Sequence, residues 1–465
     1  MGNEPRHLIS RRSLLKAAGV GVAGLSLSAI PTGLLGRSRG TGDQNSDTGL
    51  PFQEGYFPPS EQDGGWRVGD PSALGVNGAR LREAVRYHDE NFVTTSFGGG
   101  LVIVYKGHII GESYTTGAEG GPQLWTASTC NDMKSSTKSV FGTAVGVFLE
   151  EHKDRVNLDT YLVGSSLEDS LIPQIWDQAI TDDRKKRIKV KHVISMTSGH
   201  ETREPWLAPS TRSHYPGYSG PYQMYEYCFG WWSFEGIPAH HTLRFEPGSA
   251  FNYSNYGLEQ MALAMRNISG EQVGPYLYDR VLRPIGMPAG IRANAYRDMP
   301  YADNRELNFS DEPGWGVGGG EGCDAYGADK SDSPIGYNSI VGSTFRCTAR
   351  DFARLGYLWL NRGRWGSQQL VPEEWLRVAT RRFVREDGTT PNNYGYTFWI
   401  QDGLEGVPDD LFMSRGHNLN HSYVIPSLDL VVVRQGNQNR QREGEPSFPT
   451  TLIQKIVASI PEQDA

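Results

Sequence analysis

A serine and a lysine three residues apart open an apolar part of the chain, and this pair could carry out nucleophilic chemistry. Ser135 and Lys138 stand in the segment DMKSSTKSVFGTAVGVFLEE, which covers residues 132–151. On a helix, residues i and i+3 share a face, so the lysine amine could reach the serine hydroxyl. A neutral amine can activate that hydroxyl, and burial favours the neutral form of an amine. The alternative is a helix N-cap beside a solvated lysine.

The residues after this pair predict a helix with one buried face. Apolar residues recur every three or four positions: Val140, Phe141, Ala144, Val145, Phe148 and Leu149. Ser135 would then lie in the first helical turn, where unpaired N–H groups and the helix dipole favour negative charge. The same spacing also occurs at Ser13 and Lys16, so spacing alone is a weak argument.

A second polar motif, Tyr253-Ser254-Asn255, lies between a Pro-Gly pair and an amphipathic stretch in residues 246–265. A tyrosine beside the lysine could relay a proton between the serine and the leaving group. Asn255 could orient Lys138 and the substrate amide or ester. The alternative is a tight turn followed by a capped helix. We predict Ser135 as the nucleophile, with Lys138 and Tyr253 moving its proton.

In this order, the Ser-x-x-Lys and Tyr-x-Asn motifs resemble those of the penicillin-recognising serine hydrolases. That group includes class C β-lactamases and family VIII esterases, and the chain most resembles its branch that holds 6-aminohexanoate-dimer hydrolase and promiscuous carboxylesterases. The resemblance runs from about Asp70 to the C-terminus and includes RIKVKHVISMTSGH (187–200), VLRPIGM (281–287), residues 342–375 and YGYTFWI (394–400). It implies the β-lactamase/transpeptidase-like fold and a hydrolase that needs no metal and no organic cofactor.

The third motif of that family, a strand with Lys-Thr-Gly or His-x-Gly, has no direct counterpart. Its place falls on His417-Asn418-Leu419, with leucine where glycine would let a ligand carbonyl approach the strand. Either Gly416 takes that role through a shift of register, or the wall of the site is built differently. His417 either contacts a substrate carboxylate or Lys138, or is a surface-loop histidine.

The same departure bears on the oxyanion hole and on the substrate. We expect the Ser135 N–H and a second N–H near Asn420 to form the hole. Without a cationic strand residue, β-lactams and peptidoglycan stem peptides lose a charge-assisted anchor. The sequence therefore favours an ester or amide substrate over an antibiotic.

The order of helical and strand patterns predicts an α+β fold of two lobes. The expected elements are a helix over 79–92, a hairpin over 100–114, strands over 393–400, 421–425 and 428–436, and a terminal helix over 450–460. An antiparallel sheet from both chain ends would be flanked by helices, with a mostly helical region inserted. We assign the α/β lobe to about 70–130 and 340–465, and the helical lobe to about 131–339.

The N-terminus resembles a twin-arginine export signal. SRRSLLK (10–16) precedes the apolar stretch AAGVGVAGLSLSAI (17–30), which is shorter than the ~20 apolar residues of a membrane span. We assign 1–49 to the signal and a linker and 50–465 to the hydrolase domain. The protein is expected in the periplasm or outside the cell, without a stable membrane span. An uncleaved N-terminal tether is the alternative.

Composition excludes several other functions. A net charge of −8 and a pI near 5.8 offer no basic surface for nucleic acid. Cys130, Cys228, Cys323 and Cys347 lack the spacing of a zinc site, and their pairing stays open. The acidic, glycine-rich residues 312–334 lack the spacing of a calcium loop. We therefore predict no metal site; the oligomeric state is open.

Taken together, the sequence predicts an exported serine hydrolase that cleaves a small-molecule carboxylic ester or amide through an acyl-enzyme. Within the enzymes, a D-amino-acid peptidase or a weak β-lactamase is the alternative. Outside them, the altered third motif favours a non-catalytic, penicillin-binding-like sensor or binding protein.

A loop over residues 200–244 is rich in aromatic side chains, glycine and proline and is too irregular for one helix. We expect it to form a substrate wall, with Trp231 and Trp232 selecting bulky acyl groups, rather than a small separate core. Replacing Trp231 or Trp232 by alanine should then raise KM selectively for large esters. Steady-state kinetics on a series of esters checks this, and equal effects on small and large esters reject it.

Overall fold

The computed structural model describes residues 55–92, 98–115, 125–129, 131–173, 182–200, 242–271, 273–287, 345–436 and 448–461. All of them belong to one unit, Gly49–Ala465. Several sequence predictions lie outside the described residues: the export signal, Trp231 and Trp232 with nearly all of their loop, and Cys130, Cys228 and Cys323.

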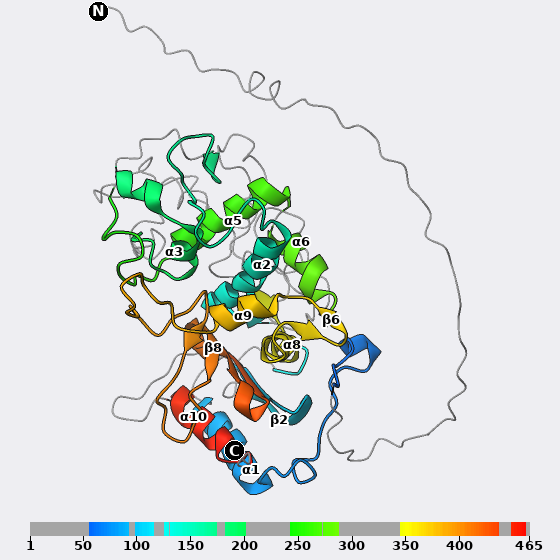
Figure 1. The fold of residues 1–465 in the computed structure, drawn as a ribbon. Coiled ribbons are helices and arrows are strands. Elements are labelled where there is room, and N and C mark those ends of the chain that lie inside the picture. Colours follow the sequence, from blue (N-terminus) through cyan, green and yellow to red (C-terminus); the bar gives the residue numbers. More distant parts are fainter. Residues whose placement is uncertain are drawn as a thin grey trace, which may run out of the picture. The chain divides into compact units, whose positions relative to one another are not determined.

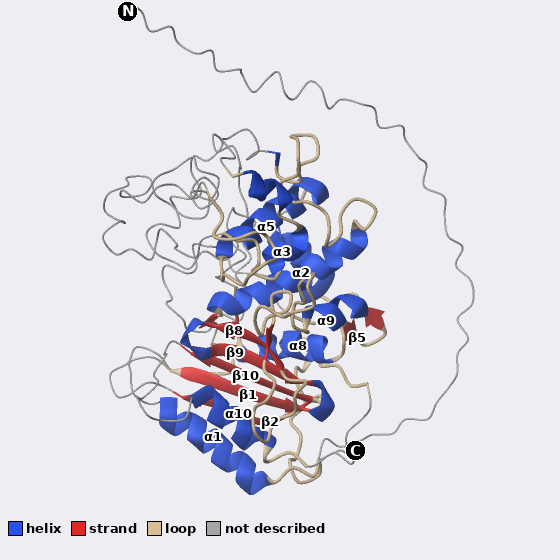
Figure 2. Cartoon of the chain, turned by 60° about the vertical axis from the view of Figure 1, so that its left-hand side comes forward, coloured by secondary structure: helices blue, strands red, loops and turns tan. Residues whose placement is uncertain are grey.

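A six-stranded antiparallel sheet is built from both ends of the chain, in the order β2-β1-β10-β9-β8-β7 (Figure 2). Its strands are β1 (Gly99–Tyr105), β2 (His108–Thr115), β7 (Trp399–Ile400), β8 (Phe412–Gly416), β9 (Asn420–Ile425) and β10 (Leu430–Gly436). The predicted hairpin and the two C-terminal strands are confirmed. The sheet therefore joins sequence positions more than 300 residues apart.

The strand predicted over 393–400 is wrong in its extent, since only Trp399–Ile400 joins the sheet. The preceding backbone turns toward α9 (Glu373–Ala379) instead, where the Tyr396 N–H donates to the Ala379 carbonyl at 3.0 Å. At Gly395, a Cβ would lie 2.2 Å from that same carbonyl oxygen. The close approach of two backbones thus ends the strand pattern.

Both faces of the sheet are covered at its central strands β1 and β10, which explains why these two strands are mostly apolar. In β1, Val102 and Val104 pack into one core, and Leu101, Ile103 and Tyr105 pack into the other. This alternation follows the two-residue period of a strand. The two cores lie on opposite faces of the sheet, and each is closed by its own helices.

Figure 2 shows α1 (Gly78–Phe92) and α10 (Phe448–Val457) below the sheet and α8 (Ala349–Leu360) above it. The remaining helices are α2 (Thr137–Glu151), α3 (Val190–Ile194), α5 (Asn255–Ser269) and α6 (Val273–Leu277), with a π turn at Tyr278–Leu282. Short strands pair as β3 (Asn131–Asp132) with β4 (Arg346–Cys347), and as β5 (Arg364–Trp365) with β6 (Gln368–Gln369). Within the described residues, 3-10 turns lie at Glu61–Asp63, Lys134–Ser136, Asp183–Arg187, His417–Leu419 and Pro426–Leu428.

Helix α2 is central to the molecule. It packs against α5, α6 and α9, and also against β8 (Figure 1). The sequence predicted one buried face, but every residue from Thr137 to Phe148 is buried. Glycine makes this possible, because a Cβ at Gly142 would lie 1.8 Å from Thr397 Oγ1. The polar residues at the start of α2 are therefore inside the protein.

No helix among the described residues is both long and apolar enough to cross a bilayer.

Helix α3 supports α5, and a buried histidine caps its start. The Lys189 N–H donates to His192 Nδ1 at 3.2 Å, and the His192 side chain is 7% exposed. Burial, together with the nearby charges of Lys191 and Lys189, lowers the pKa of His192 to about 4. The ring is therefore neutral in the folded state at pH values where an unfolded histidine is already charged.

We expect this histidine to make the protein acid-sensitive. The folded-state pKa lies below the unfolded value of about 6.5, so between pH 6.5 and 4 the unfolded protein binds a proton that the folded protein does not. The free energy of unfolding is therefore full above pH 6.5 and falls as the pH approaches 4, by up to about 3 kcal/mol. His192→Gln keeps an acceptor for the Lys189 N–H but does not titrate. Denaturant unfolding at several pH values should show a shallower acid loss for this variant, and parallel curves for both proteins would contradict the assignment.

Candidate active site

Ser135 lies in a tight turn just before α2. The turn is the 3-10 segment Lys134–Ser136, and α2 begins at Thr137. The sequence predicted Ser135 in the first turn of the α-helix. The structure places it in a 3-10 turn directly before that helix instead. Lys134, directly before it, has φ 52°, a left-handed conformation that is uncommon for residues other than glycine and concentrates at functional sites.

The structure brings Lys138 to Ser135. Lys138 Nζ donates a hydrogen bond to Ser135 Oγ at 3.1 Å. The lysine side chain is buried, with 1% exposed, whereas Ser135 is half-buried. The serine is therefore partly accessible, whereas the lysine that contacts its hydroxyl is enclosed.

Tyr253 lies against the same amine, although it comes from a distant part of the chain. Lys138 Nζ is 4.8 Å from the centre of the Tyr253 ring. The tyrosine is in the loop before α5, where the Asn252 N–H donates to the Met196 carbonyl at 2.8 Å. Asn255, the first residue of α5, is buried. A hydroxyl, an amine and a phenol ring thus meet at the start of α2.

Two aromatic residues that the sequence did not single out stand beside Tyr253. Trp399 stacks on its ring with centres 6.2 Å apart, and Tyr394 packs against Trp399 at 4.9 Å. Burial, with Tyr253 nearby, raises the pKa of Tyr394, so its phenol stays protonated. Both residues belong to the aromatic segment YGYTFWI, whose pattern predicts a strand and does not mark a part of the site.

Strand β8 forms the wall behind the nucleophile turn, and its last residue is Gly416. A Cβ at Gly416 would lie 2.1 Å from the Met133 carbonyl oxygen and 3.1 Å from Ser136 N. Ser414, two residues earlier on the same face, donates from its hydroxyl to the Ser136 carbonyl at 3.1 Å. Only glycine permits this close approach.

The register of the third motif is therefore shifted relative to the position expected from the sequence. Residues His417–Leu419 form a 3-10 turn after the strand, in which Asn418 and Leu419 both have φ 60°. Gly416, not Leu419, is the glycine of the wall. The His417 side chain is exposed on that turn.

Asn420 does not offer the second N–H of an oxyanion hole. Its N–H donates to the His417 carbonyl, and its own carbonyl accepts the Ser136 hydroxyl at 2.5 Å. Its side-chain oxygen accepts from Asn131 Nδ2 at 2.9 Å and from the Gly436 N–H at 2.8 Å. Asn420 is thus a junction that ties the wall to the nucleophile turn and to β10.

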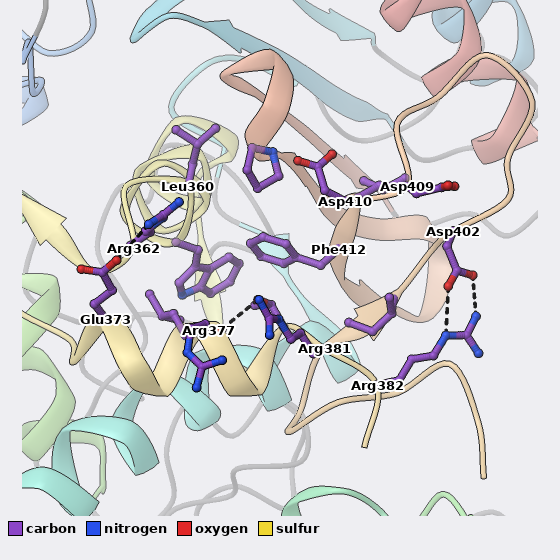
Figure 3. Close-up of a pocket in the computed structure, with 16 residues that line it drawn as sticks. Leu360, Arg362, Glu373, Arg377, Arg381, Arg382, Asp402, Asp409, Asp410 and Phe412 are labelled. Carbon is purple, nitrogen blue, oxygen red and sulfur yellow. Dashed lines mark hydrogen bonds and ion pairs between the residues drawn. The ribbon is translucent and has the colours of Figure 1, made fainter. Parts of the chain in front are cut away.

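Within the described ranges, no group of three or more His, Cys, Asp or Glu side chains could hold a metal ion. A groove of about 580 Å³ is lined by residues of α8, α9, β7 and β8 (Figure 3). Arg362 pairs there with Glu373 at 2.9 Å, and Arg382 donates to Asp402 at 3.0 Å. Ser135, Lys138 and Tyr253 do not line it, so it is separate from the candidate site.

Comparison with known proteins gives one family and a shared fold. The family model described as Beta-lactamase matches residues 90–447. Comparison with curated protein sequences found no match.

Solved structures resemble this chain over most of its length. A penicillin-binding protein homologue from Caulobacter crescentus is 15% identical with a TM-score of 0.55, over 83% of this chain and 99% of that one. A protein from Bacillus anthracis assigned to the 6-aminohexanoate-dimer hydrolases is 17% identical with a TM-score of 0.54, over 90% and 92%. A family VIII carboxylesterase is 16% identical with a TM-score of 0.53, over 82% and 97%. The predicted β-lactamase/transpeptidase-like fold is confirmed.

The contact between β8 and the nucleophile turn yields a stability prediction. Gly416→Ala should lower the free energy of unfolding by about 1–3 kcal/mol, because the new methyl group collides with fixed backbone atoms. Gly111→Ala is a matched control in β2, where the nearest atom to a Cβ is a side-chain carbon at 3.5 Å. Thermal and denaturant unfolding of both variants check this, and equal losses would show that β8 does not approach the turn closely.

Proposed function

Because the chain belongs to the beta-lactamase family and is a serine hydrolase, we propose that it cleaves a carboxylic ester or amide through an acyl-enzyme on Ser135. The observation that carries the proposal is the 3.1 Å hydrogen bond between Lys138 Nζ and Ser135 Oγ. A half-buried hydroxyl in contact with an enclosed amine is a complete nucleophile and base pair.

The reaction proceeds in two steps. Ser135 Oγ attacks the carbonyl carbon while its proton moves to Lys138, and the C–O or C–N bond of the substrate breaks as that proton passes to the leaving group, through the Tyr253 phenol. Water then attacks the acyl-enzyme, gives up a proton to the same groups, and releases the acid and the free serine. Protons and bonds balance without any cofactor.

The wall at the end of β8 completes the site. The Ser135 N–H is one donor for the oxyanion. Gly416 meets the nucleophile turn, and the His417 N–H is the next amide of the chain, so we assign the second donor to His417 in place of Asn420. This assignment explains why the strand must approach Ser136 so closely.

The wall also bears on the substrate class. On β8, Phe412, Ser414 and Gly416 share the face that carries the core around α2, whereas Arg415 belongs to the alternate positions, where its guanidinium lies 5.5 Å from the centre of the Trp399 ring. In the Lys-Thr-Gly motif the lysine stands two residues before the glycine. Ser414 occupies that position here, and its hydroxyl donates to the Ser136 carbonyl. A neutral wall favours uncharged esters and amides over substrates that need a carboxylate anchor. As the N-terminal sequence suggests, the enzyme acts after export.

Ser135→Ala should lower kcat for p-nitrophenyl acetate by at least about a thousandfold, because the acyl-enzyme cannot form. Ser139→Ala is the matched control: this serine lies one turn further along α2, and its hydroxyl donates to the Thr397 carbonyl at 2.7 Å. The control should keep its activity. Initial rates on protein that is folded by circular dichroism check this, and an active Ser135→Ala variant would refute the assignment.

A fluorophosphonate probe separates an enzyme from a non-catalytic sensor with the same fold. If the protein is an enzyme, the probe should label Ser135 covalently and the unlabelled protein should turn over esters. Labelling without turnover would indicate a sensor, and absence of both would reject Ser135 as a nucleophile.

A further inference from the structure

Arg434 lies on the face of the sheet opposite the nucleophile. In β10, Val431 and Val433 pack toward α2 and α8, and Leu430 and Val432 pack toward α1 and α10. The two-residue period places Arg434 with the second set. It is 3% exposed and pairs across the sheet with His421 of β9. An arginine is thus enclosed directly behind the wall of the candidate site.

The guanidinium of Arg434 is bonded to the turn that follows β8. Arg434 Nη1 donates to the carbonyl of Asn418, in the middle of the turn His417–Leu419. Asn418 and Leu419 both have φ 60°, which is sparsely populated, above all for leucine. Such a conformation persists only where surrounding groups enforce it.

Both ends of this turn touch the nucleophile segment. Gly416, before it, approaches Met133 O and Ser136 N, and Asn420, after it, accepts the Ser136 hydroxyl. A change in the conformation of the turn therefore moves the backbone that contacts Met133 and Ser136, the residues around Ser135. Arg434 bonds to Asn418 from one face of the sheet. Ser136 and Asn131 bond to Asn420, the residue after the turn, from the side of the nucleophile.

The surroundings of Arg434 show that it is not merely filling space. His421 and Tyr423 lie on the same face of the sheet, joined at 2.8 Å. Burial lowers the pKa of Arg434 to about 9, which leaves it protonated at neutral pH. A buried charge is expensive unless hydrogen bonds compensate it, and the bond to the Asn418 carbonyl is one that an apolar residue of equal size could not make.

We propose that Arg434 is a positioning residue: it fixes the turn His417–Leu419 and thereby the wall amide that receives the oxyanion. The proposal rests on the function proposed for Ser135. It assigns Arg434 no contact with the substrate, so its effect should fall on the chemical step and not on substrate binding.

Arg434→Met tests this, since methionine keeps an apolar stem and removes the donors. We expect kcat to fall about tenfold to hundredfold, the range for losing a charged hydrogen-bond donor, with KM changed by less than about threefold. Arg434→Lys, which keeps the charge with a different geometry, should lie between methionine and wild type. A folded Arg434→Met variant with wild-type kcat, or with only KM changed, overturns the proposal.

A second buried arginine provides the matched control. Arg354 is 0% exposed and donates to the carbonyls of Pro58 and Ile285 at 2.9 and 3.3 Å. It thereby joins the segment before α1 to the residues after the π turn and does not contact the wall. Arg354→Met should lose stability but keep kcat per folded molecule. An equal fall in kcat for both variants would show a general loss of rigidity and overturn the proposal. If Arg434→Met does not fold, Arg434→Lys decides alone, and wild-type kcat in that variant overturns the proposal.

The rate of Ser135 labelling by a fluorophosphonate separates a failure of the proposed hydrolase function from a failure of the positioning role of Arg434. If wild type is labelled but does not turn over esters, the proposed function fails. The labelling rate still tests Arg434, because attack of Ser135 on the probe develops negative charge on a phosphonyl oxygen in the same oxyanion hole. This rate should fall in Arg434→Met and not in Arg354→Met. Equal labelling rates in these two variants overturn the positioning role.

Discussion

The amine of Lys138 lies 3.1 Å from the Ser135 hydroxyl and is almost wholly removed from water, and the surrounding structure serves to keep it there. A long, flexible lysine has to be enclosed on every side to hold one geometry. Helix α2 is buried along its first three turns, so the lysine projects from a rigid element. Tyr253 covers the amine, and the tyrosine is itself backed by Trp399.

The second constraint is the close contact between β8 and the nucleophile turn. At Gly416 the strand backbone approaches Met133 and Ser136 too closely for any side chain. Asn420 and Ser414 add hydrogen bonds across the same contact. The sheet thus contributes the backbone of β8 to the site, and the contact between this backbone and that of the nucleophile turn sets its shape. Chemistry at Ser135 can then depend on residues, such as Arg434, that lie on the opposite face of the sheet.

The sequence was sufficient for the parts of the site that depend on local spacing. Ser-x-x-Lys places two side chains on one face of a helix, and the alternation of apolar residues predicts the hairpin and the C-terminal strands. It was insufficient where tertiary contacts decide. The left-handed turn at Asn418 and Leu419 carries no glycine, so no local pattern predicts it, and the sequence leaves open whether Gly416 or a differently built wall replaces the expected glycine. Trp399, Tyr394 and Arg434 read as ordinary strand residues, because their roles arise from neighbours distant in sequence.

The central claim is that the Ser135 hydroxyl, with its proton taken up by Lys138, carries the acyl group during turnover. Rapid quenching of a reaction with a p-nitrophenyl ester, followed by protease digestion and tandem mass spectrometry, locates that group directly. We expect an acyl adduct on Ser135 that forms within the first turnover and disappears once the ester is consumed. An adduct on Ser136, Thr137 or another residue, or steady turnover without any acylated protein, would contradict it.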